Sequence, residues 1–218
     1  MLLHLLSGPV NWGDVLAWLL AVVVAITVHE FAHAKSAEIA GDPTARKAGR
    51  VTLNPLAHYD LVGSSMFLIM GFGWAKPVPI NPLYFKNRRR DSVLVSLWGP
   101  LANLIAAIVL AIPLRVGFAG DHETTLAIMV FANLMLAVFN LIPIAPLDGS
   151  HILEGALSAR ANQRLAAFYA RNQQLLLIAF LVVFLTPVGG PVFRMVQIPV
   201  YIMVQLLTGH GLFYWLAE

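Results

Sequence analysis

The sequence contains no cysteine and few charged residues. Without thiols the chain can form neither disulfide bonds nor a thiolate metal site, so any bound metal must be held by His, Asp or Glu. Only 11% of the 218 residues are charged, and 59% are hydrophobic. Soluble domains are about 25% charged. The composition therefore excludes an ordinary soluble domain and indicates an integral membrane protein.

A secretory signal peptide is also missing. The first twelve residues, MLLHLLSGPVNW, have neither a basic leading region nor a small-residue cleavage site. We therefore expect the chain to keep its N-terminus. The net charge of +3 comes from basic residues that gather in loops beside apolar runs. That pattern is typical of a membrane topology signal and does not favour a nucleic acid as partner.

Five apolar stretches have close to the roughly 20 residues that a membrane-spanning helix needs. They are residues 15–40, 92–113, 124–144, 165–186 and 192–207. A sixth run, residues 61–73, is shorter and contains three glycines, which is more typical of a re-entrant segment. The sequence therefore predicts an all-α polytopic membrane protein with about five transmembrane helices and one re-entrant segment.

Basic loops predict the topology. They lie at residues 46–50, 86–90 and 160–164. Cytoplasmic loops collect Lys and Arg. If residues 61–73 re-enter the membrane, all three basic loops fall on the same side. We therefore expect a multi-pass protein of the cell membrane, with the N-terminus outside and the C-terminus in the cytoplasm.

Two segments beside the re-entrant run lack helical periodicity. They are ARKAGRVTLNPL, residues 45–56, and GFGWAKPVPIN, residues 71–81. Their β-branched residues, glycines and prolines predict short β-strands and turns near the active site. Irregular backbone at membrane depth also indicates a nearby cavity. We expect one membrane-embedded domain over residues 1–218, with a core at 13–158 and C-terminal helices at 164–216.

The first span contains the sequence HEFAH, residues 29–33. His29 and His33 stand four apart, so on a helix they project from one face. Two imidazoles in this arrangement can bind one Zn²⁺. Glu30, which lies between them in the sequence, is placed to act as a general base toward a metal-bound water. Ionisable groups inside a span are costly and are functional by default, so a metal site is favoured over core polar groups. If the interface begins at Lys35, His29 lies about 9 Å inside the membrane, near its cytoplasmic face.

A catalytic zinc site usually has a third protein ligand. Asp148 is a candidate, because Pro143 and Pro146 should end the preceding span and leave Asp148 on the same side of the membrane as His29. An alternative role for Asp148 is the N-cap of a short following helix.

His151 and Glu154 are rival ligands one and two turns further on. A carboxylate reduces the buried charge of the site, which favours Asp148 over His151. This argument does not separate Asp148 from Glu154.

The chain resembles the site-2 protease family of intramembrane zinc metalloproteases, in its compact form without PDZ or CBS domains. The resemblance rests on five motifs in order, covering residues 25–155: HEFAHA, GRVTLNPLAH, GFGWAKPVPIN, GPLANL and NLIPIAPLDG. It implies hydrolysis of peptide bonds in or next to a transmembrane segment of a substrate protein in the lipid bilayer. It further implies one Zn²⁺ per chain on His29, His33 and Asp148, with Glu30 as catalytic base and Asn140 near the substrate.

Two other functions are conceivable from the residues. A metal-ion or proton transporter would also carry His and Asp in its spans, but it usually needs them along a path across the bilayer. A catalytically silent homologue that binds membrane proteins would not need the intact Glu30. Of the remaining polar residues, we expect Asn103 to hydrogen-bond between helices and His58, in the basic loop region, to be a solvated or turn residue and not a ligand.

Overall fold

The computed structural model describes residues 11–60, 63, 75–186 and 189–211. These residues are mostly helical, and no β-strand occurs among them. The predicted helical class is therefore confirmed for the described part of the chain. The predicted re-entrant run, residues 61–73, lies outside the described residues apart from Gly63.

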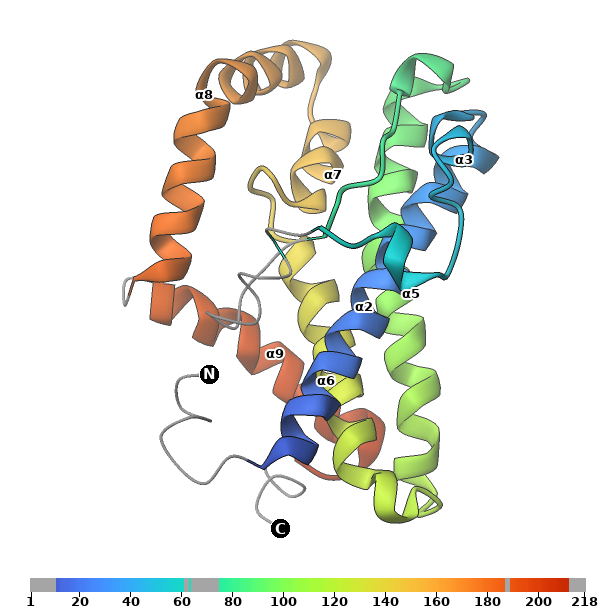
Figure 1. The fold of residues 1–218 in the computed structure, drawn as a ribbon. Helices are drawn as coiled ribbons and strands as arrows, with labels where there is room; N and C mark the ends of the chain where they lie inside the picture. The colour runs from blue at the N-terminus through green and yellow to red at the C-terminus, as the bar shows by residue number, and fades with distance from the viewer. Residues whose placement is uncertain (1–10, 61–62, 64–74, 187–188, 212–218) are drawn as a thin grey trace.

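Three long helices lie side by side and form the core (Figure 1). They are α2 (Trp12–Ile39), α5 (Arg88–Arg115) and α6 (Glu123–Asn140). Asn11 caps α2 by accepting a hydrogen bond from the Gly13 amide at 3.0 Å. Asn87 caps α5 through the Arg90 amide at 3.1 Å. Both caps satisfy amides that a helix start leaves without a partner.

Small side chains bring α2 close to its neighbours. Ala17, Ala21 and Ala25 are spaced by four residues and pack against Ile128 and Ala132 of α6. In lipid no hydrophobic force drives helices together, so close contact between small residues is an important attraction. The same spacing continues from Ala25 to residues 29 and 33, so the packed face of α2 is also the face that carries the two histidines.

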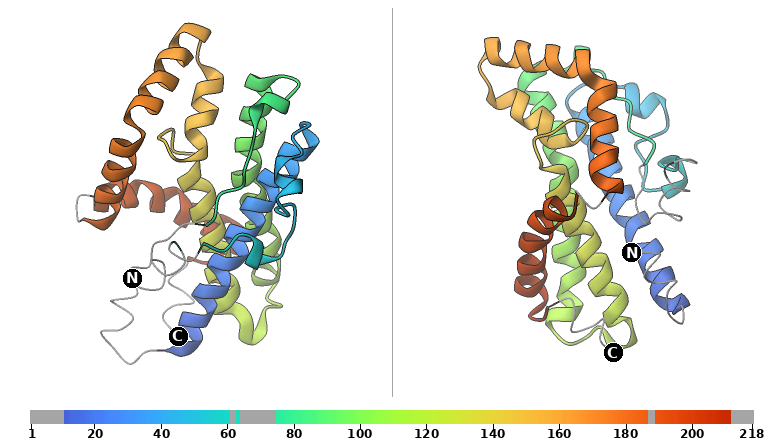
Figure 2. Two further views of the ribbon diagram at one scale, coloured as in Figure 1. Left: turned by 45° about the horizontal axis from the view of Figure 1, so that its top comes forward. Right: turned by 90° about the vertical axis from the view of Figure 1, so that its left-hand side faces the viewer.

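The last described helix, α9 (Gly190–Thr208), packs against α5 and α6. Its buried Val200 and Val204 join a cluster that includes Ala107 and Ala111 of α5 and Leu134 of α6. Figure 2 shows α9 beside these two helices. Among the described residues, the buried residues of this cluster come from α5, α6, α9 and the loop before α6.

Among the described helices, α2, α5 and α6 are long and apolar enough to cross a membrane. The apolar part of α9, Phe193–Thr208, is shorter. The remaining long helix, α8 (Ala159–Leu185), loses helical geometry at Asn172, where φ is −116° and ψ is 16°. The bend is visible in Figures 1 and 2. Three of the five predicted spans are therefore confirmed as candidates.

The short helix α7 (Asp148–Ala156) follows α6 after a turn. The turn contains Pro143 and Pro146, and α6 ends at Asn140, as expected from proline's missing amide. α7 packs on α5, and α8 packs on α7. This connection brings the start of α7 back to the three-helix core.

The predicted β-strands near residues 45–56 and 71–81 are absent from the described residues. The first segment begins in a helical turn, α3 (Thr44–Lys47), and continues through a 3-10 turn at Pro55–Ala57. The second is extended from residue 75 to 81, but Pro77 and Pro79 have no amide hydrogen to donate to a ladder. The first segment thus turns, and only the second is extended, without strand pairing among the described residues. Two further 3-10 turns, Pro82–Tyr84 and Gly120–His122, precede α5 and α6.

Candidate metal centre

Two imidazoles meet on the packed face of α2. His29 and His33 are each 6% exposed. Their Nε2 atoms lie 3.0 Å apart, and their rings are nearly perpendicular at 86°. The spacing of four residues therefore puts both rings in one buried place, as the sequence predicted.

Each ring is oriented by an acceptor on α5. His29 Nδ1 donates to the side-chain oxygen of Asn103 at 2.7 Å, and His33 Nδ1 donates to the Val95 carbonyl at 2.8 Å. A neutral imidazole has one N–H and one lone pair, so a proton fixed at Nδ1 leaves the lone pair at Nε2. Both Nε2 lone pairs are thus turned toward the same point.

Asp148, the first residue of α7, supplies the third side chain of this group. Its Oδ2 lies 3.1 Å from His29 Nε2 and 3.2 Å from His33 Nε2. It does not cap the helix: the N-cap residue is Leu147, whose cap makes no side-chain hydrogen bond. Burial raises the pKa of the Asp148 carboxyl, whereas a proton or positive charge on the neighbouring imidazoles lowers that pKa, and the lowering is the larger effect when the rings are protonated. The Asp148 carboxylate is thus placed to share a proton or a cation with the two rings.

These three atoms fit a zinc ion. Zn²⁺ bonds to His and Asp are about 2.0 to 2.2 Å long, so tetrahedral geometry places neighbouring ligand atoms about 3.3 to 3.5 Å apart. The three observed separations, 3.0, 3.1 and 3.2 Å, are slightly shorter. Two lone pairs and a carboxylate at such distances repel one another unless a proton or a cation lies among them. Two imidazoles and one carboxylate can hold Zn²⁺ and leave a fourth position open.

Gly99 lets α5 approach the two rings. A Cβ atom at this position would lie 2.3 Å from His33 Nε2 and 2.7 Å from His29 Cε1. Gly149 plays a similar part beside Asp148, since a Cβ there would lie 2.4 Å from the carbonyl oxygens of Leu141 and Ile142. Side chains larger than hydrogen would therefore displace the ligand atoms or the turn that carries Asp148.

Asn103 has a more specific role than the expected helix contact. It is fully buried, and its amide group donates to the Ala25 carbonyl at 2.8 Å and to Asn133 at 2.9 Å. These two acceptors fix the amide, so its oxygen faces His29. The motif GPLANL contained both Gly99 and Asn103, but their relation to the histidines depends on how α5 packs on α2.

Glu30, the predicted base, is next to His29 and is partly buried. Its Oε2 accepts a hydrogen bond from the backbone amide of Val78 at 3.1 Å. Nothing in the sequence indicated this contact, because the two residues are 48 positions apart.

The other residues considered for the site lie outside the group. His151 Nδ1 and Glu154 Oε2 are 3.4 Å from each other, so the two rival ligands form a pair of their own. Asn140 donates to the Leu136 carbonyl of its own helix at 3.0 Å. Within the described residues, the group that could hold a metal ion consists of His29, His33 and Asp148.

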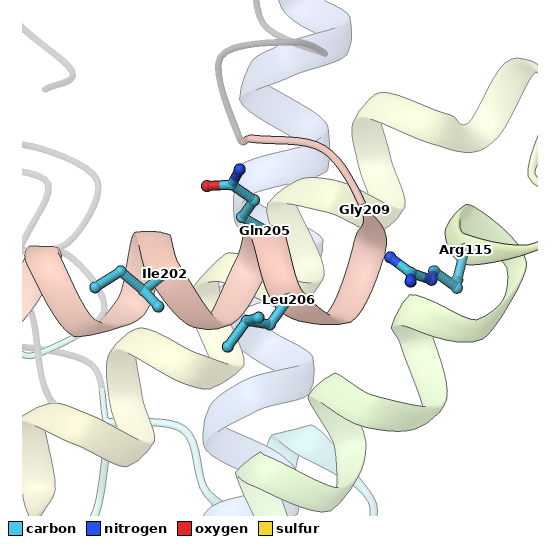
Figure 3. Close-up of a pocket in the computed structure, with 5 residues that line it drawn as sticks. All are labelled: Arg115, Ile202, Gln205, Leu206 and Gly209. Carbon is cyan, nitrogen blue, oxygen red and sulfur yellow. The ribbon is translucent and has the colours of Figure 1, made fainter.

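A pocket elsewhere in the molecule has different chemistry. It measures about 470 Å³ and lies where the end of α5 meets the end of α9 (Figure 3). Its lining is Arg115, Ile202, Gln205, Leu206 and Gly209. Arg115 is sixteen residues, or about 24 Å along the helix, from Gly99. The pocket contains no metal-binding side chain and is separate from the three-residue group.

Comparison with known proteins finds relatives that are named as zinc metalloproteases. The model of peptidase family M50 matches residues 114–184. The chain is 39% identical over 183 residues to "Putative zinc metalloprotease YwhC" of Bacillus subtilis, which covers 78% of this chain and 81% of that protein. It is 33% identical over 189 residues to "Putative zinc metalloprotease Rip2" of Mycobacterium tuberculosis, covering 82% and 71%. No solved structure matches the chain.

The replacement Gly99→Ala should reduce zinc binding, because the added methyl group would displace both imidazoles. We expect the zinc affinity to fall by about 10- to 100-fold, as it does when the surroundings of metal ligands are disturbed. Metal analysis after dialysis against a graded chelator measures this. Gly190→Ala is the matched control, since a Cβ there meets no atom within 4 Å. Equal zinc content in the two variants would contradict the role of Gly99.

Proposed function

Because the chain belongs to peptidase family M50, the site-2 protease family, we propose that it is an intramembrane zinc endopeptidase. It cuts peptide bonds in or next to transmembrane segments of membrane proteins, as in regulated intramembrane proteolysis. The observation that carries the proposal is the convergence of His29, His33 and Asp148 beside a carboxylate on a helix apolar enough to span a membrane.

In this proposal His29, His33 and Asp148 hold one zinc ion per chain. When bound, zinc polarises the scissile carbonyl and lowers the pKa of water toward 7. Glu30 takes a proton from the attacking water and later delivers it to the leaving amine. Asn103 and the Val95 carbonyl keep both imidazoles in the tautomer that presents Nε2 to the metal.

A substrate helix hides its carbonyls in its own hydrogen bonds, so the scissile segment must unwind before attack. We propose that Asn140, at the end of α6, contacts this unwound segment. Strand addition to residues 75–80 is not favoured. The amides of Lys76 and Val78 already donate within the chain, and Pro77 and Pro79 have none.

We also propose that the N-terminus lies outside and that the C-terminus and the active site face the cytoplasm. The three basic loops support this topology. Figure 1 shows α3, the start of α5 and the start of α8 at the same end of the helix bundle, and these elements carry the loop arginines. Residues 1–218 would act as one domain, with the metal site in the core at 13–158 and the helices at 164–216 beside it.

The replacement Glu30→Gln tests the proposed chemistry. The amide keeps the shape of the side chain but accepts no proton, so cleavage should fall by at least about 100-fold while zinc content stays the same. The assay is cleavage of tagged single-span membrane proteins reconstituted with the protein in vesicles. Mass spectrometry of cell membranes would identify the substrates that accumulate uncut. Unchanged cleavage by the variant would refute the proposal.

Topology can be mapped with single cysteines, because the chain has none of its own. Lys47→Cys and Arg88→Cys replace exposed residues at the end that we assign to the cytoplasm, and Asp121→Cys replaces an exposed residue at the other end. In intact cells a membrane-impermeant maleimide should label residue 121 alone. Labelling of residues 47 and 88 on opposite faces would overturn the proposed topology.

A further inference from the structure

The extended segment at residues 75–81 lies against the proposed catalytic base. In Figure 1 it is part of the teal-to-green trace that leads to the start of α5. Between Pro77 and Pro79, Val78 supplies the one backbone amide, and that amide donates to Glu30 Oε2 at 3.1 Å. A carboxylate has a second oxygen, so one can be held while the other exchanges protons.

The segment is fastened on both sides of Val78. Before it, the Lys76 amide donates to the His58 carbonyl at 3.0 Å. After it, the Asn81 amide donates to Asp42 Oδ2 at 2.6 Å, and Asp42 is fully buried just beyond the end of α2. These two hydrogen bonds hold the backbone on either side of Val78. They therefore fix the position of Val78 relative to α2, the helix that carries Glu30.

Arg50 also holds this segment. Arg50 is 5% exposed, and its guanidinium donates to the carbonyls of Lys76 and Pro77, the latter at 3.3 Å. It also donates to His58 Nδ1 at 3.4 Å, while His58 Nε2 donates to the Thr52 carbonyl at 2.9 Å. His58 lies in the turn that follows Pro55–Ala57, as expected, but it is 2% exposed and is therefore not solvated.

The burial of Arg50 is costly for stability. No carboxylate pairs with it among the described residues, and its Nε has no hydrogen-bond partner. A buried charge whose partners are neutral carbonyls is destabilising compared with an apolar side chain of similar size. A function for the guanidinium in the folded protein would explain why it is placed there.

We propose that residues 75–81 form a positioning strap, in which the Val78 amide holds Glu30 and Arg50, supported by His58, holds the strap. Arg50 and Val78 are thus positioning residues for the base. The catalytic part of this inference rests on the proposed protease function, whereas the structural part does not. Misplacement of a reacting group by about 1 Å can lower a rate by about 100-fold.

Hydrogen exchange tests the strap without any substrate. Because of the two prolines, residues 76–80 contain only the amides of Lys76, Val78 and Ile80. We expect Glu30→Ala to speed exchange of the Val78 amide by about tenfold or more, since a hydrogen bond to a charged acceptor is lost. Arg50→Gln should speed exchange across the strap, while α6 peptides stay unchanged. Equal exchange at Val78 in wild type and Glu30→Ala would overturn the strap.

The proposed role of the strap in catalysis is tested by cleavage kinetics. The substrate is one that accumulates uncut in cells that carry the Glu30→Gln variant. Val78→Pro removes the amide and should lower kcat by about 10- to 100-fold with KM changed less than about threefold. Val78→Ala keeps the amide and should lower kcat far less. Arg50→Gln should behave like Val78→Pro, with partial recovery in Arg50→Lys. Arg88→Gln, an exposed arginine at the start of α5, is the control for charge.

The outcomes distinguish the two proposals. Faster amide exchange in the variants, with no cleavage by the wild type or by any variant, would support the strap and refute the proposed protease function. A raised kcat in Val78→Pro would mean that the strap restrains Glu30 instead of positioning it, and a raised KM with unchanged kcat would assign Arg50 to substrate binding. Either result overturns the positioning role. If Arg50→Gln fails to fold, Arg50→Lys and Val78→Pro carry the test.

Discussion

The meeting of two imidazole lone pairs and one carboxylate inside a helix bundle is the constraint on which the rest of the structure depends. Such a group is unfavourable in an apolar interior unless a cation or a proton balances it. The surrounding residues are arranged to keep it in place. Acceptors on α5 hold both Nδ1 protons, and Gly99 leaves room for the rings. The start of α7 delivers Asp148 to the same point.

Packing between small residues makes this convergence possible. The alanine stripe of α2 sets the helix against α6, and the histidines continue that stripe by the same four-residue step. The ligands come from elements far apart in the chain, since His33 and Asp148 are separated by 115 positions. The positions of the three side chains therefore follow from the packing of α2 on α5 and of α7 on α5.

The local patterns were readable from the sequence, and the long-range contacts were not. A step of four residues predicts that His29 and His33 share a helix face, because helix geometry is local. Charge alone could not choose between Asp148 and Glu154, since the choice depends on how the turn after α6 folds back. Asn103 was expected to join helices, and its contact with His29 required the packed structure. The expected strands are absent from the described residues because residues 45–56 turn, and because residues 75–81, though extended, have no partner strand that the local sequence could reveal.

The most direct test of the central claim is zinc stoichiometry and zinc K-edge X-ray absorption on the purified wild-type protein. The account predicts one zinc per chain, with two imidazole nitrogens and one carboxylate oxygen at about 2.0 to 2.2 Å, and an oxygen of water or solvent in the remaining position. Absence of bound zinc after purification in zinc-containing buffer would contradict it. So would a spectrum with a single imidazole or none.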